Sequence, residues 1–465
     1  MTRTMKKLYS MNGIFSGALI VASLCPVPAA WAQRPSEAEL KTLSSALPLI
    51  QQQNWSAAET TLQEGMASFP HSALLSNALG IVYEREHRQP DAIRAFEQAV
   101  EWLPNFTAAQ LHLASLHAER GECDRANSLF LAAAANTADE GALSEAGLGL
   151  AECKNFAGAA QVLEKARSAS PSPAIIFNLA LVLYKTSEFD AALSMLETLP
   201  HGPEQERAEV LYLRGKLLKA LQKPGSAASL AQACRQHAQE DYCKDAAVEM
   251  IATEQLTEAV TLLESANKGL SAPSVSLLCA LGLAQFRLGR YQASIRSYSS
   301  ALNIDPQLDA AREGLGFLLY ITGELEQARS IVEQGPPRPT VDFYLPYLRA
   351  LVLYRTSAAL WPEALSALAQ SLRSNANFAA SYFLRGKIAL EQGNETRALA
   401  DFQNAAKLDP TYPLPYYKMS QIYLRQGRRE EAEQARKRFA ALGNQREDEL
   451  LAKQAQALLL THASH

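Results

Sequence analysis

The feature that most constrains this chain is a spaced pattern of small, aromatic and proline residues that recurs along it. The first clear copy consists of Gly80, Ala92, Phe96, Ala99 and Pro104, at offsets of 12, 16, 19 and 24 from the glycine. The same offsets recur in copies that start at Gly147, Gly282 and Gly386, and weaker copies start at Ala114, Ala180, Gly215, Ala247, Gly316, Ala350 and Ser420. Steps between these anchors are mostly 32 to 35 residues. A fixed period of this length indicates a helical solenoid.

The residue types fit a stack of paired antiparallel helices. A glycine or alanine anchor and an alanine twelve positions later allow two helices to approach closely, and larger residues such as Tyr83 and Phe96 fill the space around that contact. The closing proline lacks an N–H and clashes with a preceding carbonyl, so it ends the second helix. Glycines that tolerate a positive φ mark the turn inside a pair, namely Gly121, Gly289, Gly323, Gly393 and Gly427. One pair alone leaves an apolar face exposed, and stacking buries it.

With this pattern the chain resembles the tetratricopeptide repeat (TPR) family over nearly all of its length. The resemblance implies an all-α superhelical solenoid of about twelve helix pairs, an array that we place at residues 33–442. "LPHGPEQER" (199–207) and "GPPRPT" (335–340) interrupt the array and are expected bends, and "YRTSAALWPEA" (354–364) predicts a longer turn within a pair. Residues 443–465 are predicted to form a C-terminal capping helix and a frayed tail.

Residues 1–32 are typical of a secretory signal peptide. Arg3, Lys6 and Lys7 precede an apolar stretch from Ile14 to Leu24, and the segment ends in the cleavage pattern Ala30-Trp31-Ala32. The alternative, an uncleaved membrane anchor, is weaker because a spanning helix needs about 20 apolar residues. Cleavage leaves 41 basic and 48 acidic residues, a net charge of −7. We expect an exported bacterial protein, periplasmic or secreted, with no membrane span after cleavage.

Five cysteines remain after the predicted cleavage. The resemblance implies that the start of a second helix lies near the end of the next first helix, the relation between Cys123 and Cys153. Cys234 and Cys243 lie on either side of a short turn between units. Both pairs are therefore candidate disulfides in an oxidising compartment. The alternative is that buried cysteines serve here as small hydrophobic residues.

Motifs that would indicate catalysis are missing from the sequence. It has no HExxH zinc motif, no G-x-S-x-G elbow, no phosphate-binding GxxxxGK[ST] loop and no C-x-x-C pair. His112 and His117 are five positions apart, which does not place two ligands on one helical face. We therefore predict no enzyme activity, no cofactor and no metal site. The formal charge of −4 argues against nucleic-acid binding, which needs a basic surface.

The resemblance also implies which residues bind a partner. In the family, the first helix of each unit lines a concave groove that binds peptides or helices of other proteins. Mapped onto this sequence, the groove positions are Phe177, Asn178, Lys185, Lys216, Lys219, Arg287, Tyr320, Arg355, Lys387, Tyr417 and Arg425. Asn178 and Lys185 match the asparagine and the basic residue of peptide-clamping repeats, but the other units lack the asparagine. These basic and aromatic residues predict a negatively charged protein or peptide partner, against the alternative that they are ordinary solvated helix residues.

These observations lead to a main functional hypothesis and two alternatives. The main hypothesis is a non-catalytic protein–protein interaction scaffold in the bacterial cell envelope. The first alternative is a periplasmic assembly component of a polysaccharide, pilus or secretion export machine. The second, an enzyme fused to repeats, lacks a catalytic segment in the sequence. The sequence does not identify the partner, the pathway or the oligomeric state.

Overall fold

The computed structural model describes residues 35–270, 272–333, 343–443 and 447–464. The predicted signal peptide lies outside these residues. Within them, the regular secondary structure consists of 25 α-helices, α2 to α26, and one short 3₁₀ helix, with no strand. The all-α solenoid predicted from the repeat period is confirmed.

Contacts divide the chain into two compact units, which meet between Ser226 and Ala227. The first unit contains α2 (Glu37–Gln51), α3 (Trp55–Ser68), α4 (Ala73–Arg85), α5 (Gln89–Trp102), α6 (Thr107–Glu119), α7 (Cys123–Ala135), α8 (Glu140–Glu152), α9 (Phe156–Ala169), α10 (Pro173–Lys185), α11 (Phe189–Glu197) and α12 (Ala208–Ala220). α13 (Ser226–Gln236) begins at the boundary.

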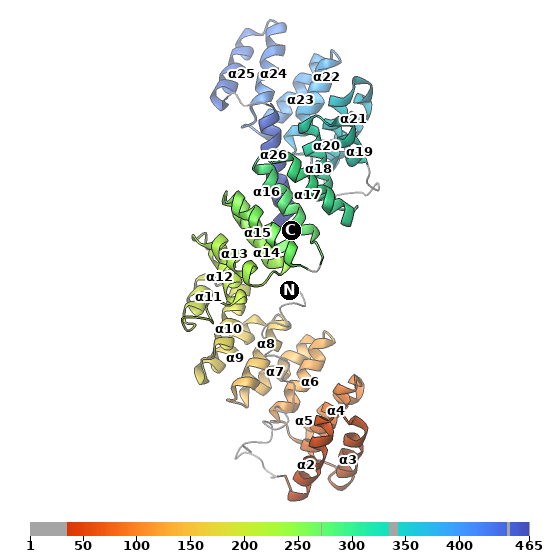
Figure 1. Cartoon of the computed structure of the whole chain (residues 1–465), viewed down its shortest axis with the longest axis vertical. Coiled ribbons are helices and arrows are strands. Elements are labelled where there is room, and N and C mark those ends of the chain that lie inside the picture. The colour runs from red at the N-terminus through yellow and green to blue at the C-terminus, as the bar shows by residue number, and fades with distance from the viewer. Residues whose placement is uncertain (1–34, 271, 334–342, 444–446, 465) are drawn as a thin grey trace. The chain divides into compact units, whose positions relative to one another are not determined.

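The second unit continues with α14 (Glu240–Ala252), α15 (Leu256–Gly269), α16 (Val275–Arg287), α17 (Tyr291–Ile304), α18 (Asp309–Thr322), α19 (Leu325–Glu333), α20 (Tyr344–Thr356), η2 (Ala358–Leu360), α21 (Trp361–Ser374), α22 (Ala379–Glu391), α23 (Glu395–Leu408), α24 (Pro413–Arg425), α25 (Arg429–Leu442) and α26 (Glu447–Ser464). Within the two units, eleven even-numbered helices pack on the odd-numbered helix that follows each of them, as in α4·α5 and α22·α23 (Figure 1). We call the even-numbered members first helices.

The close approach within a pair depends on a glycine that lies directly under a large side chain. A Cβ added at Gly80 would come within 2.5 Å of the ring of Phe96, and one added at Gly386 within 2.7 Å of Phe402. Both rings are fully buried. Within a pair, the closest contact is therefore between the anchor glycine of the first helix and the large side chain sixteen positions later on the second helix. At offset 12, the Ser294 hydroxyl donates to the carbonyl of its anchor, so this position also lies in the contact, as predicted.

The turn inside eleven of the helix pairs passes through a residue with positive φ, and the turn of α20·α21 instead contains η2. At the five predicted turn glycines φ lies between 72° and 87°. Six other pairs place a residue with a side chain there, with φ between 53° and 65°: Gln53, His87, Lys154, Ser187, Gln222 and Glu254. The geometry of the turn is therefore shared, although glycine is not required for it.

The predicted interruptions coincide with local irregularities where the structure describes them. Residues 200–207 form an extended turn after the short, nine-residue α11. The longer turn predicted within residues 354–364 contains η2. The segment 335–340 lies outside the described residues, and its predicted bend stays a prediction.

Both predicted cysteine pairs are joined as disulfides in the structure. Cys123 and Cys153 have Cα atoms 5.3 Å apart, and Cys234 and Cys243 have Cα atoms 4.8 Å apart. Both separations suit a disulfide, which needs about 4.4–6.8 Å. The first bond joins the start of α7 to the residue that follows α8. Oxidation of the pairs in the cell stays a prediction.

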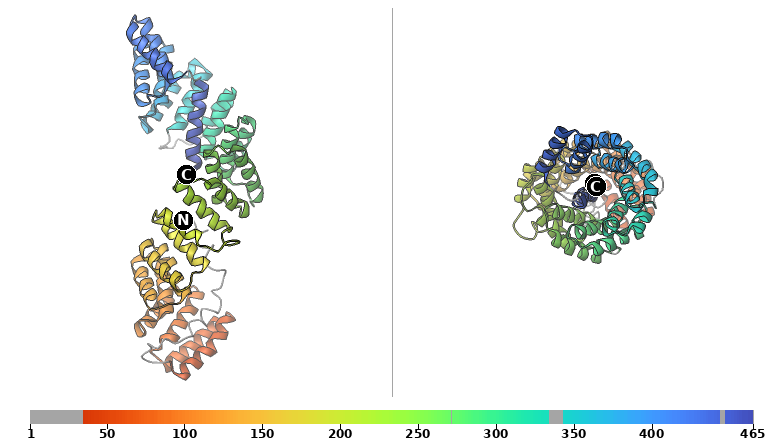
Figure 2. Two further views of the ribbon diagram at one scale, coloured as in Figure 1. Left: turned by 90° about the vertical axis from the view of Figure 1, so that its left-hand side faces the viewer. Right: turned by 90° about the horizontal axis from the view of Figure 1, so that it is seen from above.

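The C-terminal helix α26 packs on more of the chain than the end of the last pair. A cap would cover the apolar face of the last pair, α24·α25. In the structure α26 contacts α14, α16 and α18, which are first helices of three earlier pairs, and its Leu450 also packs against the apolar core of α22 to α25 (Figures 1 and 2). Leu451, Ala455 and Leu459 form its buried stripe. These three residues lie four positions apart, so they share one helical face, which can bury itself wherever an apolar surface is available.

Candidate functional site

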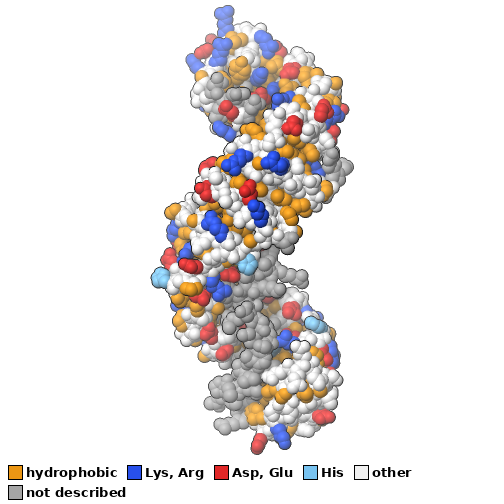
Figure 3. Space-filling view, in the orientation of Figure 1, with side chains coloured by type: hydrophobic (Ala, Val, Ile, Leu, Met, Phe, Trp, Pro, Cys, Tyr) orange, Lys and Arg blue, Asp and Glu red, His pale blue; other side chains and the backbone are white. Residues whose placement is uncertain are grey.

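The predicted partner-binding residues all lie on first helices, which pack side by side. α8 contacts α10 and α10 contacts α12 in the first unit, while α14, α16, α18, α20 and α22 form a continuous row in the second. We call the surface that each row forms its first-helix face. Figure 3 shows basic and acidic side chains interspersed on the visible surface of the molecule. The chemistry of the candidate site therefore depends on which side chains of these helices reach that face.

Three of the predicted residues are buried in the fold. Phe177 packs in the apolar core around α11 and α12. Asn178 and Tyr320 are also buried. Because they are almost inaccessible to solvent, these side chains contribute to packing within the chain, and a partner would meet their neighbours first.

The three predicted arginines hold successive repeats together. Arg287 donates from Nη1 to the carbonyl of Ile251 over 2.8 Å, and Arg355 donates to the carbonyl of Tyr320 over 3.1 Å. Both carbonyls lie in the last turn of the preceding first helix, where backbone acceptors lack a partner within the helix. Arg425 forms an ion pair of 3.1 Å with a carboxylate of α23. The structure thus gives these arginines intrachain contacts, and their contact with a partner stays a prediction.

The predicted lysines of the first unit are more accessible. Lys185 ends α10, and Lys216 and Lys219 lie on the neighbouring α12. Lys185 and Lys219 are exposed, while Lys216 is half-buried. The Lys185 ammonium lies 5.7 Å from the ring centroid of Tyr184. These three lysines lie on two first helices that contact each other, and we call them the basic patch.

A polar cluster on α4, α6 and α8 was missed by the sequence analysis, which considered its histidine only as a metal ligand. His112 Nδ1 lies 3.3 Å from a carboxylate oxygen of Glu84, and its ring stacks on Phe96 with centroids 5.0 Å apart. Burial raises the pKa of the nearby Glu145 carboxyl. The charge of His112 acts to lower that pKa, and the negative charge of Glu84 acts to raise it. His112, Glu145 and Asn178 are spaced 33 residues apart. Polar residues at the same position of successive repeats were the feature of the sequence that could have predicted this cluster.

In the second unit, the predicted residue Lys387 binds a carboxylate of this same chain. Its Nζ lies 2.7 Å from Oε1 of Glu447 at the start of α26 and 4.9 Å from the ring centroid of Tyr354. The Tyr354 hydroxyl donates to Glu391 on α22. Burial lowers the pKa of the neighbouring Lys418, the positive charge of Lys387 lowers it further, and Glu447 opposes these effects. Two basic side chains and an aromatic ring thus surround one acidic group.

Tyr417 is the remaining predicted residue. Its side chain is exposed on α24, and its ring lies 5.3 Å from that of Phe439 on α25. The Lys418 ammonium is 5.9 Å from the same ring. Tyr417 therefore offers an accessible aromatic surface next to the basic residues of the second unit.

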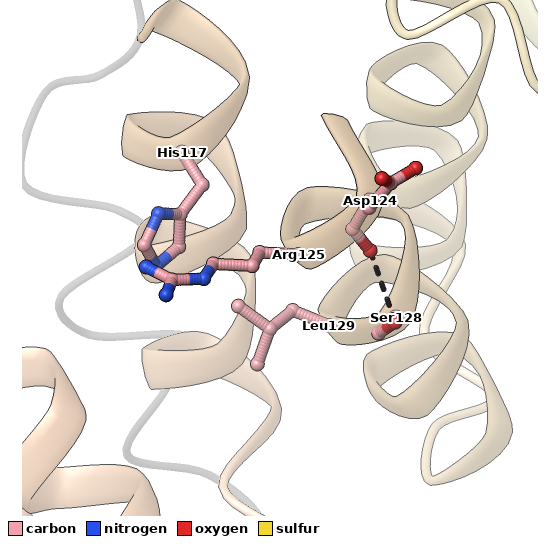
Figure 4. Close-up of a pocket in the computed structure, with 5 residues that line it drawn as sticks. All are labelled: His117, Asp124, Arg125, Ser128 and Leu129. Atoms are coloured by element: carbon pink, nitrogen blue, oxygen red, sulfur yellow. Dashed lines mark hydrogen bonds between the residues drawn. The ribbon is translucent and has the colours of Figure 1, made fainter. Parts of the chain in front are cut away.

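A small hollow lies at one end of the α6·α7 pair (Figure 4). It has a volume of about 440 Å³ and is lined by His117, Asp124, Arg125, Ser128 and Leu129. The Ser128 hydroxyl donates to the backbone carbonyl of Asp124, and His117 Nδ1 lies 2.9 Å from a Glu122 carboxylate outside the hollow. The histidine and serine are thus engaged separately and do not form a nucleophile–base pair.

The described part of the chain contains no group of three or more His, Cys, Asp or Glu side chains arranged to hold a metal ion. Its helices include none with the length and apolar character needed to cross a membrane.

Comparison with solved structures returns other helical-repeat proteins at low similarity. Pseudomonas aeruginosa PilF is 20% identical, with a TM-score of 0.36 over 44% of this chain and 95% of that one. TTC0263, a thermophilic TPR protein from Thermus thermophilus, is 22% identical, with a TM-score of 0.33 over 40% of this chain and all of that one. The APC/C assembly Cut9–Hcn1 is 13% identical, with a TM-score of 0.38 over 92% of this chain and 91% of that one. Scores this low carry no argument about function.

Sequence comparison with protein families is more informative. A search of curated proteins finds no match. Models of the tetratricopeptide repeat match residues 44–105 and 275–308, and a model of the TPR repeat matches residues 386–427. The matches lie near the beginning, middle and end of the array, and each covers paired helices of the structure. The chain is therefore a tetratricopeptide-repeat protein.

Proposed function

We propose that this protein is an exported scaffold of the bacterial cell envelope, which binds partner proteins through its first-helix faces. Tetratricopeptide repeats support a role in protein–protein interaction. The proposal adds the location and the chemistry of the partner, which carries acidic groups on a helix or an extended peptide. The protein is proposed to be non-catalytic, and its binding energy for a partner comes from many modest contacts along a repetitive surface.

The observation that carries the proposal is the Lys387–Glu447 contact. A first helix of the second unit already binds a carboxylate with its predicted ligand-binding lysine, over 2.7 Å. The basic patch of Lys185, Lys216 and Lys219 occupies the corresponding surface of α10 and α12 in the first unit. Charge-assisted hydrogen bonds of this kind suit recognition of acidic side chains.

The proposed export rests on the sequence of residues 1–32 and is supported by the cysteines. Four of the five cysteines of the mature chain are close enough in pairs to form disulfides, and such bonds persist in oxidising compartments such as the periplasm. Mass spectrometry of the protein recovered from cell fractions tests this part of the proposal. It should find the protein outside the cytoplasm with Gln33 as its first residue.

Partner binding is tested by crosslinking and pull-down of the mature protein in the periplasmic fraction, followed by mass spectrometry. The informative variant reverses two exposed lysines of the basic patch, Lys185→Glu and Lys219→Glu. Its matched control reverses Arg94 and Arg125, whose side chains are 72% exposed on second helices. We expect the first variant to lose a partner that the wild type and the control both capture. Equal capture by all three proteins would contradict a role for the first-helix face of the first unit.

A further inference from the structure

α26 lies on the surface that the proposed function assigns to partners. Its contacts are with α14, α16 and α18, which are first helices of three successive pairs in the second unit. The helices of the array pack mainly against sequence neighbours, whereas α26 packs against helices far earlier in the chain. It therefore lies where a bound helix of another protein would lie.

The contacts of α26 combine one acidic group with an apolar stripe. Glu447 binds Lys387, while Leu451, Ala455 and Leu459 are buried. These four residues are spaced four apart in the sequence, so they follow one face of the helix. The pattern defines the kind of helix that fits this surface, in which a carboxylate precedes three aliphatic or small residues at intervals of four.

The surroundings of Glu447 form a binding site for a carboxylate. Lys387 is only 14% exposed and lies over the Tyr354 ring, which limits the positions that its ammonium can take. Lys418 on the neighbouring α24 adds a second positive charge that interacts with Glu447. An acidic residue at the first turn of a helix also interacts favourably with the helix dipole.

Two features distinguish α26 from a helix matched on all sides. Glu449 and Lys453 on its other face are exposed. Oε1 of Gln454 is buried and finds no hydrogen-bond partner among the residues that the structure describes. A buried acceptor without a partner weakens the docked state. A partner helix with an apolar residue at that position would bind the same surface with a better match.

We propose that the first-helix face of the second unit is a docking site for an acidic amphipathic helix of a partner protein, and that α26 occupies this site until the partner helix replaces it. The inference rests on the proposed scaffold function, because it assigns a ligand and a control element to one of the two first-helix faces. A helix with the Glu447, Leu451, Ala455 and Leu459 pattern competes directly with α26. The affinity of the full chain for its partner is therefore lower than that of the open site.

The test uses the full mature chain and a fluorescent synthetic peptide with the sequence of residues 447–464, titrated by fluorescence anisotropy. The variant Leu451→Asp/Leu459→Asp introduces charges into the buried stripe and should release α26. Lys453→Asp is the matched control, because it makes the same total change in charge on the exposed face of the same helix. We expect the double variant to bind the peptide at least tenfold more tightly than the wild type and the control do. Adding Lys387→Glu to the double variant should remove the gain.

Folding and oligomeric state are measured alongside. Circular dichroism checks that the double variant keeps its helix content. If it does not, Glu447→Lys opens the site by replacing the ion pair with a repulsion between like charges, and it leaves the buried stripe unchanged. Equal peptide binding by the open variant and the wild type overturns the proposal. A wild-type dimer in which copies exchange α26, detected by light scattering, overturns the intramolecular occupancy. If peptide binding increases as expected but no partner is captured from the periplasm, the docking site stands and the envelope function fails. If a partner is captured but peptide binding does not increase, the envelope function stands and the proposed docking site fails.

Discussion

The substitution Gly386→Ala tests whether the close contact between paired helices decides the stability of a repeat. The new Cβ would lie 2.7 Å from Cε1 and 2.9 Å from Cδ1 of Phe402, a ring with no solvent exposure. Overpacking of this kind costs about 1–3 kcal/mol. Alanine also favours the helix over glycine by about 1 kcal/mol. Because the two effects oppose each other, we expect a net loss of roughly 1 kcal/mol in the free energy of unfolding.

A double-mutant cycle with Phe402→Ala separates the two effects. Removing the ring costs about 3–5 kcal/mol by itself, but it also removes the three atoms nearest to the new Cβ. In that background Gly386→Ala should stabilise the protein by about 1 kcal/mol, because only the helix propensity remains. The sign of the glycine substitution therefore reverses between the two backgrounds. The coupling energy should be about 1–3 kcal/mol, well above the deviation from additivity of independent sites.

The assay should report on the affected pair, because repeat arrays do not unfold in one step. Hydrogen exchange followed by mass spectrometry gives the opening free energy of the slowest amides in α22 and α23, and urea unfolding gives the overall change. Gly141→Ala is a control, since the nearest atom to its new Cβ is the Asp139 carboxylate at 3.3 Å. It should not destabilise α8. If Gly386→Ala changes stability by the same amount and sign in both backgrounds, the contact with the ring does not decide stability.

Three further substitutions test other parts of the fold. Replacing Cys123 and Cys153 by serine opens a loop of 30 residues and should lower the free energy of unfolding by about 3.6 kcal/mol in urea titrations, whereas five free thiols in the denatured wild type would contradict the pairing. Glu145→Gln should stabilise the first unit at pH 7, because burial raises the pKa of this carboxyl and so disfavours its charged form in the fold. That advantage should shrink as the pH falls through the folded pKa and vanish below the unfolded value near 4.5. Thermal unfolding at several pH values measures it, and a difference that does not change with pH would contradict the prediction. Ser187→Gly relieves a residue with φ of 65° and should raise the free energy of unfolding by about 1 kcal/mol in urea, where a decrease would show that its side chain matters more than its backbone.

The helix pairs were predictable from the sequence because the contacts that form them are local. An anchor and the residue sixteen positions later meet across one turn, so the small and large residues of each contact recur at a fixed distance along the chain. Gly80 with Phe96 and Gly386 with Phe402 show this directly. The turn glycines were predictable for the same reason. Turns at Ser187 and similar residues were less visible, because side chains other than glycine adopt the same positive φ there.

The candidate site was less predictable, because a position on a helix does not determine what its side chain reaches. Arg287 and Arg355 lie on first helices as predicted, yet their guanidinium groups bind carbonyls of the preceding repeat, about one period earlier in the chain. Long side chains can reach across a repeat boundary as readily as into solvent. The polar cluster of Glu84, His112 and Glu145 assembles from three helices and appears only once those helices are stacked.

The position of α26 illustrates the same limit on a larger scale. The periodicity of residues 446–460 predicted an amphipathic helix after the array, and the helix exists. Where it binds depends on the competition between two apolar surfaces, the end of the last pair and the first-helix face of the second unit. That face also offers Lys387, which lies 60 residues before Glu447 in the sequence and binds it. Lys418 adds a second positive charge near this carboxylate. Charge complementarity between distant segments therefore contributes to the position of α26 on the first-helix face.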